Sequence, residues 1–221
     1  MKKMLLTLIV ALVWATGYSQ GPGYYPKGFT KGYNQPETKV DIHAGFTVAT
    51  MTNTDLDVRV GYTFGVGIEH PIYEDQWFLQ TGIDFTSKGA KHRENGTSEN
   101  FRPVYLDIPI LAKLKTEISD ANSFNVFAGP YIGIGLGGKY AYEESGKDTR
   151  EKLFTCVGSN DEPYFNRFQI GVQFGVGLEL DEHFLVNLTG QYGFNNMMKA
   201  TWNNNRNNQN LCFSLTVGYR F

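Results

Sequence analysis

The chain has few charged residues, only two cysteines and no long apolar run in its 221 residues. Charged residues make up 19% of the chain, and a formal charge of −2 at pH 7 leaves none of the basic excess that nucleic-acid binding needs. No apolar stretch reaches the length of about 18 residues that a transmembrane helix requires. These absences leave room for a membrane β-barrel, because barrel strands are apolar on one face only.

The two cysteines leave the disulfide question open. An exported chain passes through an oxidising compartment, where Cys156 and Cys212 could pair. Cys156 falls in a long loop, however, and nothing in the sequence sets its distance from Cys212. A Cys156–Cys212 disulfide and two unpaired thiols are therefore both consistent with the sequence.

The N-terminal residues have the pattern of a secretory signal peptide. Lys2 and Lys3 precede an apolar run at 4–13, and small residues before Gln20 form a cleavage site. The apolar run is too short to cross about 30 Å of hydrocarbon as an anchor. We therefore expect residues 1–19 to be a signal peptide, and the Gly-, Pro- and Tyr-rich residues 20–38 to form a flexible N-terminal segment.

Glycine and aromatic residues are abundant, and from residue 39 onward apolar and polar residues alternate. The chain has 25 Gly, 13 Tyr and 16 Phe. Alternation is the pattern of a β-strand with one apolar and one polar face. The even number of long runs predicts an all-β fold, an eight-stranded antiparallel up-and-down transmembrane β-barrel over residues 39–221. The runs are 40–48, 58–68, 79–85, 106–114, 126–136, 168–180, 184–194 and 211–221.

The connections between these runs alternate in length, which supports antiparallel order. This asymmetry is typical of outer-membrane barrels, which place short turns in the periplasm and long loops outside the cell. Pro109 and Pro130 fall inside runs, and because each lacks an N–H donor we expect β-bulges there. Short joins fall near 71–76, 119–123 and 181–183, and longer ones near 51–57, 89–102, 140–165 and 198–209.

The polar face indicates which side of the barrel meets lipid. A soluble lipocalin-like barrel would turn its apolar residues inward, so alternation alone does not decide. Here the polar face carries many glycines, which would weaken a water-exposed sheet but make room for long side chains inside a narrow barrel. The glycines are Gly61, Gly65, Gly67, Gly133, Gly135, Gly137, Gly171, Gly175 and Gly177.

Acids and bases nearly balance on the same face. Buried charges persist only when they are paired, so this balance favours a lumen filled with ion pairs over an ion-selective pore. The predicted lumen network comprises Asp41, Arg59, Glu69, Asp84, Lys88, Asp107, Lys113, Lys115, Arg167, Glu179 and Arg220.

Several stretches resemble the outer membrane protein beta-barrel domain family, small porin-like proteins common in Bacteroidetes. The resemblance implies the barrel fold and a location in the bacterial outer membrane after export. It implies little about activity, since one fold hosts many functions. The stretches are the signal ending in Tyr-Ser-Gln, FGVGIEHPIYEDQWFLQTGIDFTSKG (64–89), VYLDIPILAKLK (104–115), FAGPYIGIGLGG (127–138) and FSLTVGYRF (213–221).

The last of these stretches is the most specific. Aromatic and apolar residues alternate up to the final residue, a pattern that looks like the C-terminal signal read by the barrel-assembly machinery. A terminal strand with a free edge and an apolar outer row can be captured by strand addition. The predicted assembly signal comprises Phe213, Leu215, Val217, Tyr219 and Phe221.

No cofactor, metal site or catalytic residue is predicted. The four histidines, His43, His70, His92 and His183, are scattered without the spacing of a metal site. Catalysis would need a nucleophile or a carboxylate pair beside a histidine. Only His92 with Glu94 and Glu99 comes near this arrangement, and a solvated charged loop explains these residues better. We expect the protein not to be an enzyme.

Three functional hypotheses follow. The first is a barrel with a lumen filled by side chains and a structural or recognition role through its long extracellular loops, above all loop 140–165. The second is a narrow channel for ions or small solutes, with Asp107, Lys113 and Arg220 lining the path. The third is a part of an envelope or secretion assembly, in which residues 20–38 bind a neighbour. Expected partners are outer-membrane lipid, the barrel-assembly machinery and an envelope or extracellular protein, but no nucleic acid.

Overall fold

The computed structural model describes the barrel domain in segments. All described residues belong to the compact unit Gln35–Phe221. The expected signal peptide, the flexible segment except Thr38, and Cys156 lie outside the described residues. None of the described residues belongs to a helix that could span a membrane. The structure describes residues 38–52, 57–73, 76–94, 97–119, 121–144, 147–155, 163, 165–199 and 208–221.

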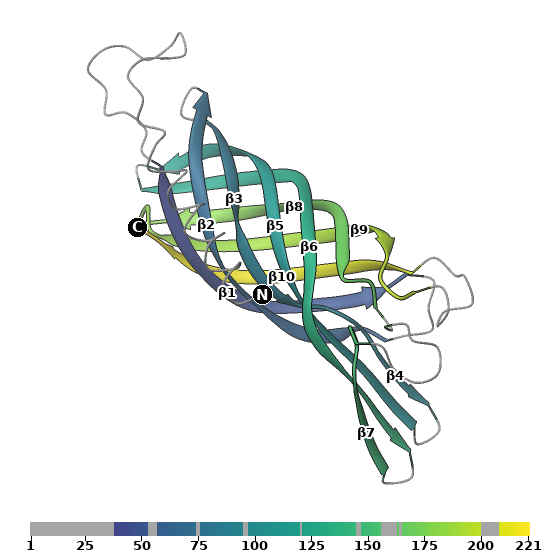
Figure 1. The fold of residues 1–221 in the computed structure, drawn as a ribbon. Coiled ribbons are helices and arrows are strands. Elements are labelled where there is room, and N and C mark those ends of the chain that lie inside the picture. The colour runs from purple at the N-terminus through teal and green to yellow at the C-terminus, as the bar shows by residue number, and fades with distance from the viewer. Residues whose placement is uncertain are drawn as a thin grey trace. The chain divides into compact units, whose positions relative to one another are not determined.

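Eight antiparallel strands form a closed ring, as the sequence predicted (Figure 1). Two pairings complete the ring. β1 pairs with β10, which joins the first and last strands of the barrel domain, and β5 pairs with β6, the next ring strand along the chain. Each strand is hydrogen-bonded to a ring neighbour on both sides, so the wall has no free edge. In ring order the strands are β1 (Lys39–Met51), β2 (Arg59–Tyr73), β3 (Trp77–Ser87), β5 (Thr97–Ser119), β6 (Asn122–Glu144), β8 (Phe168–Leu180), β9 (Phe184–Asn196) and β10 (Gln209–Arg220).

The alternation of residue types fixes which face of each strand points outward. In β1, Ile42 and Phe46 are 49% and 72% exposed, whereas Asp41 and Thr47 are almost fully buried. The same division holds in β2, where Val60 and Val66 are exposed and Glu69 is buried. Apolar side chains on the outside and polar ones on the inside suit a lipid environment. A soluble lipocalin-like barrel would show the opposite arrangement.

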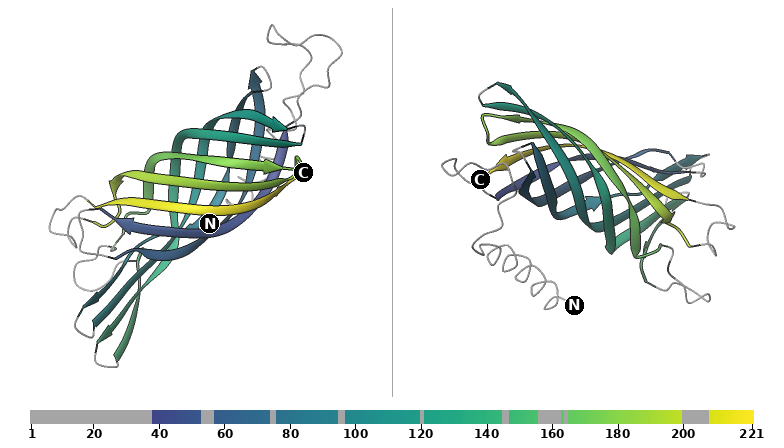
Figure 2. Two further views of the ribbon diagram at one scale, coloured as in Figure 1. Left: turned by 180° about the vertical axis from the view of Figure 1, so that it is seen from behind. Right: turned by 90° about the horizontal axis from the view of Figure 1, so that it is seen from above.

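Two further strands extend the ring into an arm, a feature the sequence did not predict. β4 (Lys91–Glu94) folds back on the first part of β5, and β7 (Lys147–Lys152) folds back on the last part of β6. The order β4-β5-β6-β7 makes a four-stranded sheet that projects beyond the barrel (Figures 1 and 2). The expected loops 89–102 and 140–165 therefore each contain a hairpin. Backbone hydrogen bonds hold the short strands β4 and β7 in place. Their sequences do not alternate between apolar and polar residues, so the pattern did not predict them as strands.

The bulges expected at Pro109 and Pro130 were wrong. The register of the β5–β6 ladder is the same on both sides of these residues, at Pro109↔Tyr131 and at Ala112↔Ala128. The two pairs between them are missing, so the ladder loses local bridges beside Pro130 but does not slip. Register shifts occur elsewhere, between Pro71 and Tyr73, Val104 and Tyr105, Glu117 and Ser119, and Gln209 and Leu211.

The shift at Val104/Tyr105 changes which glycines of β6 face inward. Before it, Gly135 faces the lumen, where an added Cβ would lie 2.5 and 2.6 Å from two ring carbons of Phe154. After it, Gly137 has nothing within 4 Å of an added Cβ, so it does not face the packed lumen as predicted. An extra residue in one strand reverses the alternation beyond it.

Candidate functional site

The interior of the barrel is the candidate site, because polar side chains from all eight ring strands converge there. The residues fall into three polar clusters and one apolar cluster. We call them the ion cluster (Glu69, Lys113, Lys115, Glu179, Arg220), the histidine cluster (Asp41, His43, Asp84), the lysine pair (Lys88, Asp107) and the apolar plug (Met51, Ala90, Phe101, Tyr105, Leu153, Phe154, Phe165, Met197, Met198).

The ion cluster is centred on the carboxylate of Glu69. Its Oε2 atom accepts hydrogen bonds from Lys113 Nζ at 2.7 Å and from Arg220 Nη2 at 2.9 Å. Its Oε1 atom accepts one from Lys115 Nζ at 2.8 Å, and Lys115 also pairs with Glu179 Oε2 at 2.8 Å. Arg220 pairs with Glu179 as well. Two acids thus hold three bases in one buried network.

The ion cluster lies at the end of the barrel with the short turns. Glu69 lies near the end of β2, Lys113 and Lys115 near the end of β5, Glu179 near the end of β8, and Arg220 at the end of β10. In an antiparallel barrel these strand ends meet at one rim. Short turns lie on the periplasmic side of outer-membrane barrels, so the cluster closes the periplasmic end.

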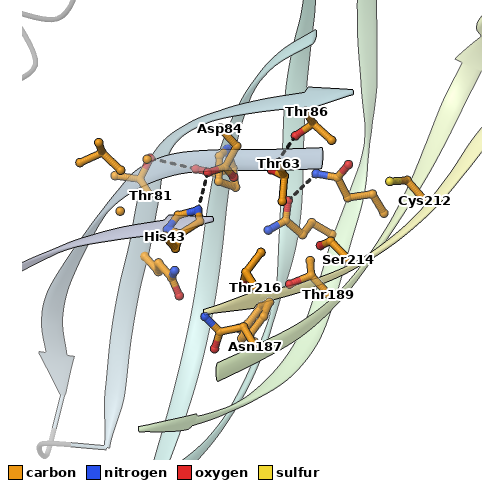
Figure 3. A pocket seen from close by; sticks show the side chains of 18 residues that line it. His43, Thr63, Thr81, Asp84, Thr86, Asn187, Thr189, Cys212, Ser214 and Thr216 are labelled. Carbon is orange, nitrogen blue, oxygen red and sulfur yellow. Dashed lines mark hydrogen bonds and ion pairs between the residues drawn. The ribbon is translucent and has the colours of Figure 1, made fainter. Parts of the chain in front are cut away.

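The histidine cluster lies farther inside. His43 Nδ1 is 2.8 Å from Asp41 Oδ1, and His43 Nε2 is 2.8 Å from Asp84 Oδ1. Both ring nitrogens therefore contact a carboxylate, as Figure 3 shows for Asp84. Asp41 and Asp84 were predicted from the sequence to lie in the lumen, whereas His43 was noted only as one of four scattered histidines. Its position two residues after Asp41, on the same strand face, was the signal that could have found it.

The lysine pair lies nearer the opposite end. Lys88 Nζ is within 2.9 Å of both carboxylate oxygens of Asp107, and it donates to Gln169 Oε1 at 3.1 Å. The ammonium also lies over two rings, 4.6 Å from the Tyr131 centroid and 5.3 Å from the Tyr105 centroid. Lys88 and Asp107 are fully buried. A buried ion pair is tolerated only with such full compensation.

Uncharged amides link these groups, and the sequence did not identify them. Gln191 Nε2 donates to Gln173 Oε1 at 2.9 Å and lies 3.4 Å from Asp107 Oδ2. A cavity of about 40 Å³ remains beside them, lined by His43, Asp84, Thr63 and Thr86 among others (Figure 3). That volume holds only a few water molecules.

The apolar plug fills the end of the barrel opposite the ion cluster. The rings of Phe101 and Phe165 are 5.7 Å apart, and Phe154 packs edge-on against both Tyr105 and Phe165. All nine plug residues are buried. They come from β1, from β5 and from the segments between strands, where single apolar residues look unremarkable in the sequence. The plug closes the end at which the arm leaves the ring.

Two residues of the predicted lumen network lie outside the ion-paired clusters. Arg167 is exposed, donates to the Phe154 carbonyl at 2.8 Å and lies over the Phe154 ring. Arg59 donates to Ser87 Oγ at 3.1 Å and to the Lys88 carbonyl at 2.7 Å. Both lie at the ends of strands, where counting along a strand no longer predicts which way a side chain points. The other nine predicted residues are all members of the three polar clusters.

The remaining sequence-based candidates are placed as follows. Cys212 is a buried free thiol in the lumen. The described residues contain no group of acids, histidines or cysteines that could hold a metal ion. The side chains of His92, Glu94 and Glu99 lie outside the described part. The assembly-signal residues are exposed on the outer face of the barrel: Phe213, Leu215, Val217, Tyr219 and Phe221.

Comparison with known proteins finds one matching family. The model of a family described as "Outer membrane protein beta-barrel domain" matches residues 21–199. No curated protein matches the chain. Similar solved structures include Ail, the attachment invasion locus protein of Yersinia pestis, bound to the heparin analogue sucrose octasulfate (14% identity, 84% of this chain and 99% of that chain, TM-score 0.42). Neisserial surface protein A (13%, 83% and 97%, 0.42) and the outer membrane enzyme PagL (13%, 80% and 97%, 0.42) are also similar.

Proposed function

This chain belongs to the outer membrane protein beta-barrel domain family and is a protein of the bacterial outer membrane, and on that premise we propose that it is a closed, non-conducting barrel that presents the β4-β5-β6-β7 arm to a protein partner. The observation that carries the proposal is closure at both ends. The ion cluster fills one end, the apolar plug fills the other, and a cavity of about 40 Å³ lies in the described lumen. An eight-stranded barrel has little more than side-chain room inside.

The channel hypothesis finds less support in the same geometry. Lys113 and Arg220 were expected to line a path, but their charged groups bind Glu69. Asp107 was expected to line it as well, but its carboxylate is bound to Lys88. Ions crossing the lumen would have to break these contacts and displace the aromatic rings of the plug.

We expect the barrel to give no conductance steps in a planar lipid bilayer. The purified protein would first be shown to be folded by the gel shift between unheated and boiled samples. Wild-type protein should stay silent, because both ends of its lumen are filled. Steps that change in reversal potential when Lys113 is replaced by Gln would instead favour the channel hypothesis and contradict closure.

The arm is the best candidate for recognition. It combines two of the four expected long loops into one sheet, and beyond the Asp57–Lys91 bridge the outer edges of β4 and β7 have no strand partner among the described residues. Free strand edges can bind another chain by strand addition. An envelope or extracellular protein is therefore the partner class we propose. The third hypothesis, binding through residues 20–38, concerns residues outside the described part.

We expect a shortened arm to abolish partner binding while the barrel still folds. Residues 92–99 and 142–149 would each be replaced by Asn-Gly, which supports a two-residue hairpin turn. This design keeps Phe101, Tyr140 and Leu153, which pack in or against the plug. A photo-crosslinking residue at position 91 would be compared in cells for full-length and shortened arms. A crosslinked partner that persists in the shortened variant would contradict the proposal.

We propose a non-catalytic role for the lumen. A catalytic histidine needs one ring nitrogen free to exchange a proton with a nucleophile or substrate. In His43, the ring nitrogens contact Asp41 and Asp84. His70 contacts the Thr38 hydroxyl at 2.8 Å in an exposed position, and among the described residues no acid contacts its other nitrogen to orient the ring.

A further inference from the structure

The arm carries a row of positively charged side chains on one face. Arg102 of β5 lies directly opposite Lys139 of β6, and Lys139 lies directly opposite Lys152 of β7. Directly opposite residues in an antiparallel ladder share a face and have neighbouring Cβ atoms. The three side chains therefore form one row across three strands. All three are exposed, and we call them the basic row.

The basic row points away from the mouth of the barrel. Each of its members is adjacent in sequence to a residue that packs in or against the apolar plug: Phe101 beside Arg102, Tyr140 beside Lys139, and Leu153 beside Lys152. The stacked rings of Phe101 and Tyr140, 4.8 Å apart, mark the inner face. Because successive strand residues point to opposite faces, the basic row lies on the outer face.

The basic row has no counter-charge in the described part of the chain. Ion pairs join each lumen base of the ion cluster to an acid, but among the described side chains none joins Arg102, Lys139 or Lys152 to one. Like charges directly opposite each other destabilise a sheet. Lys91 adds a further cation, since it pairs with Asn100, two residues from Arg102. The main chains of Asp57 and Lys91 form an isolated antiparallel β-bridge, so one acid lies beside Lys91. An anion from outside the chain would relieve this repulsion.

The basic row lies where the lipid-facing surface ends. Ile134, Leu136 and Phe168 are exposed on the outer face of the barrel, and Lys139 follows Leu136 by only three residues. The row is at the end of the barrel opposite the short turns, which is the outer surface of the membrane. Lipid phosphates lie at such a boundary and attract nearby Lys and Arg.

We propose that the basic row binds the phosphate-bearing headgroup of a lipid in the outer leaflet. The guanidinium of Arg102 offers paired donors to phosphate oxygens, and Lys139 and Lys152 add two point charges beside it. A membrane lipid fits better than free phosphate, because the row faces sideways, in line with the apolar wall below it, so one molecule can contact both. The inference is independent of the partner proposed for the arm.

Native mass spectrometry of the full barrel in neutral detergent tests this proposal. The probe is phosphatidic acid, with phosphatidylcholine as the neutral-headgroup comparison. The wild type should retain phosphatidic acid in preference to phosphatidylcholine. The variant Arg102→Gln/Lys139→Gln/Lys152→Gln should bind phosphatidic acid about 100-fold more weakly, since each cation near a lipid surface contributes about a fivefold effect. Equal retention by wild type and variant would overturn the proposal.

Two controls separate this site from general charge effects. Arg102→Lys/Lys139→Arg/Lys152→Arg keeps every charge and should keep binding within a few-fold of wild type. Lys39→Gln removes a cation near the opposite rim and should leave binding unchanged; an equal loss there would reduce the effect to net charge and overturn the site. Inorganic phosphate is the competitor. If millimolar phosphate displaces the lipid, the site recognises free phosphate and the lipid assignment is wrong. The gel shift confirms folding of each variant.

Discussion

Glu69→Gln is expected to destabilise the barrel by about 3–5 kcal/mol, the range for removing one partner of a buried ion pair. Three bases, Lys113, Lys115 and Arg220, bind Glu69 directly. Without its charge the remaining acid of the cluster would be Glu179, which pairs with Lys115 and Arg220 but not with Lys113. Lys113 would then be a buried cation without an acid. Urea titration of the barrel in lipid vesicles, followed by the gel shift of unboiled samples, measures this loss.

Two further variants make this expectation specific. Glu117→Gln removes the same charge from an exposed position on the same strand as Lys113, and a surface change of this kind should cost less than about 0.5 kcal/mol. Glu69→Met with Lys113→Met removes an acid and a base together, and should lose less stability than Glu69→Gln because fewer charges are left unpaired. A Glu69→Gln barrel as stable as Glu117→Gln would show that the charge of Glu69 contributes nothing to the stability of the barrel.

Lys88→Met is expected to be about as costly, again about 3–5 kcal/mol. The substitution leaves the Asp107 carboxylate fully buried without its base. It also removes the cation that lies over the Tyr105 and Tyr131 rings. The same urea titration in vesicles measures the effect, and the unfolding midpoint should fall without a change in slope if the folded state stays compact.

The comparison for Lys88 is Lys39→Met. Lys39 is a half-buried lysine of β1 without an ion pair among the described contacts, so its replacement should change stability little. Lys88→Met combined with Asp107→Leu removes both charges and should recover part of the loss, since an apolar pair of similar volume often replaces a buried ion pair at no net cost. If the double variant is no more stable than Lys88→Met, the pair acts through packing and not through its charges.

The sequence predicted the parts of this molecule that follow from a strict two-residue period. That period places Asp41, Glu69 and Arg220 inside and Phe46 outside, as the structure shows. It fails where the period is interrupted. One extra residue in β6 turns Gly137 away from the lumen, and Arg167, just before β8, is exposed and lies over the Phe154 ring instead of joining an ion pair in the lumen.

Other features had no periodic signal to follow. The residues of β4 and β7 are polar on both sides, so they resemble loops although their backbones form ladders. The plug is assembled from single apolar residues far apart in the sequence, such as Met51 and Leu153, and their meeting depends on the closure of the whole ring. Gln169, Gln173 and Gln191 were missed because the lumen was identified by its charges, although amides hold the same polar network together.

The pairing of β1 with β10 sets a condition on how the barrel can form. Eleven residue pairs join these strands, and the Phe221 N–H donates to the Val40 carbonyl at 2.9 Å. The backbone groups on one edge of β1 thus have no hydrogen-bond partners until β10 has been added to the sheet. Until then the growing sheet has two open edges, each able to pair with another chain. Because this seam joins the most distant strands of the domain, closing it is an entropically slow step, and a chain arrested before β10 is the species most prone to aggregate.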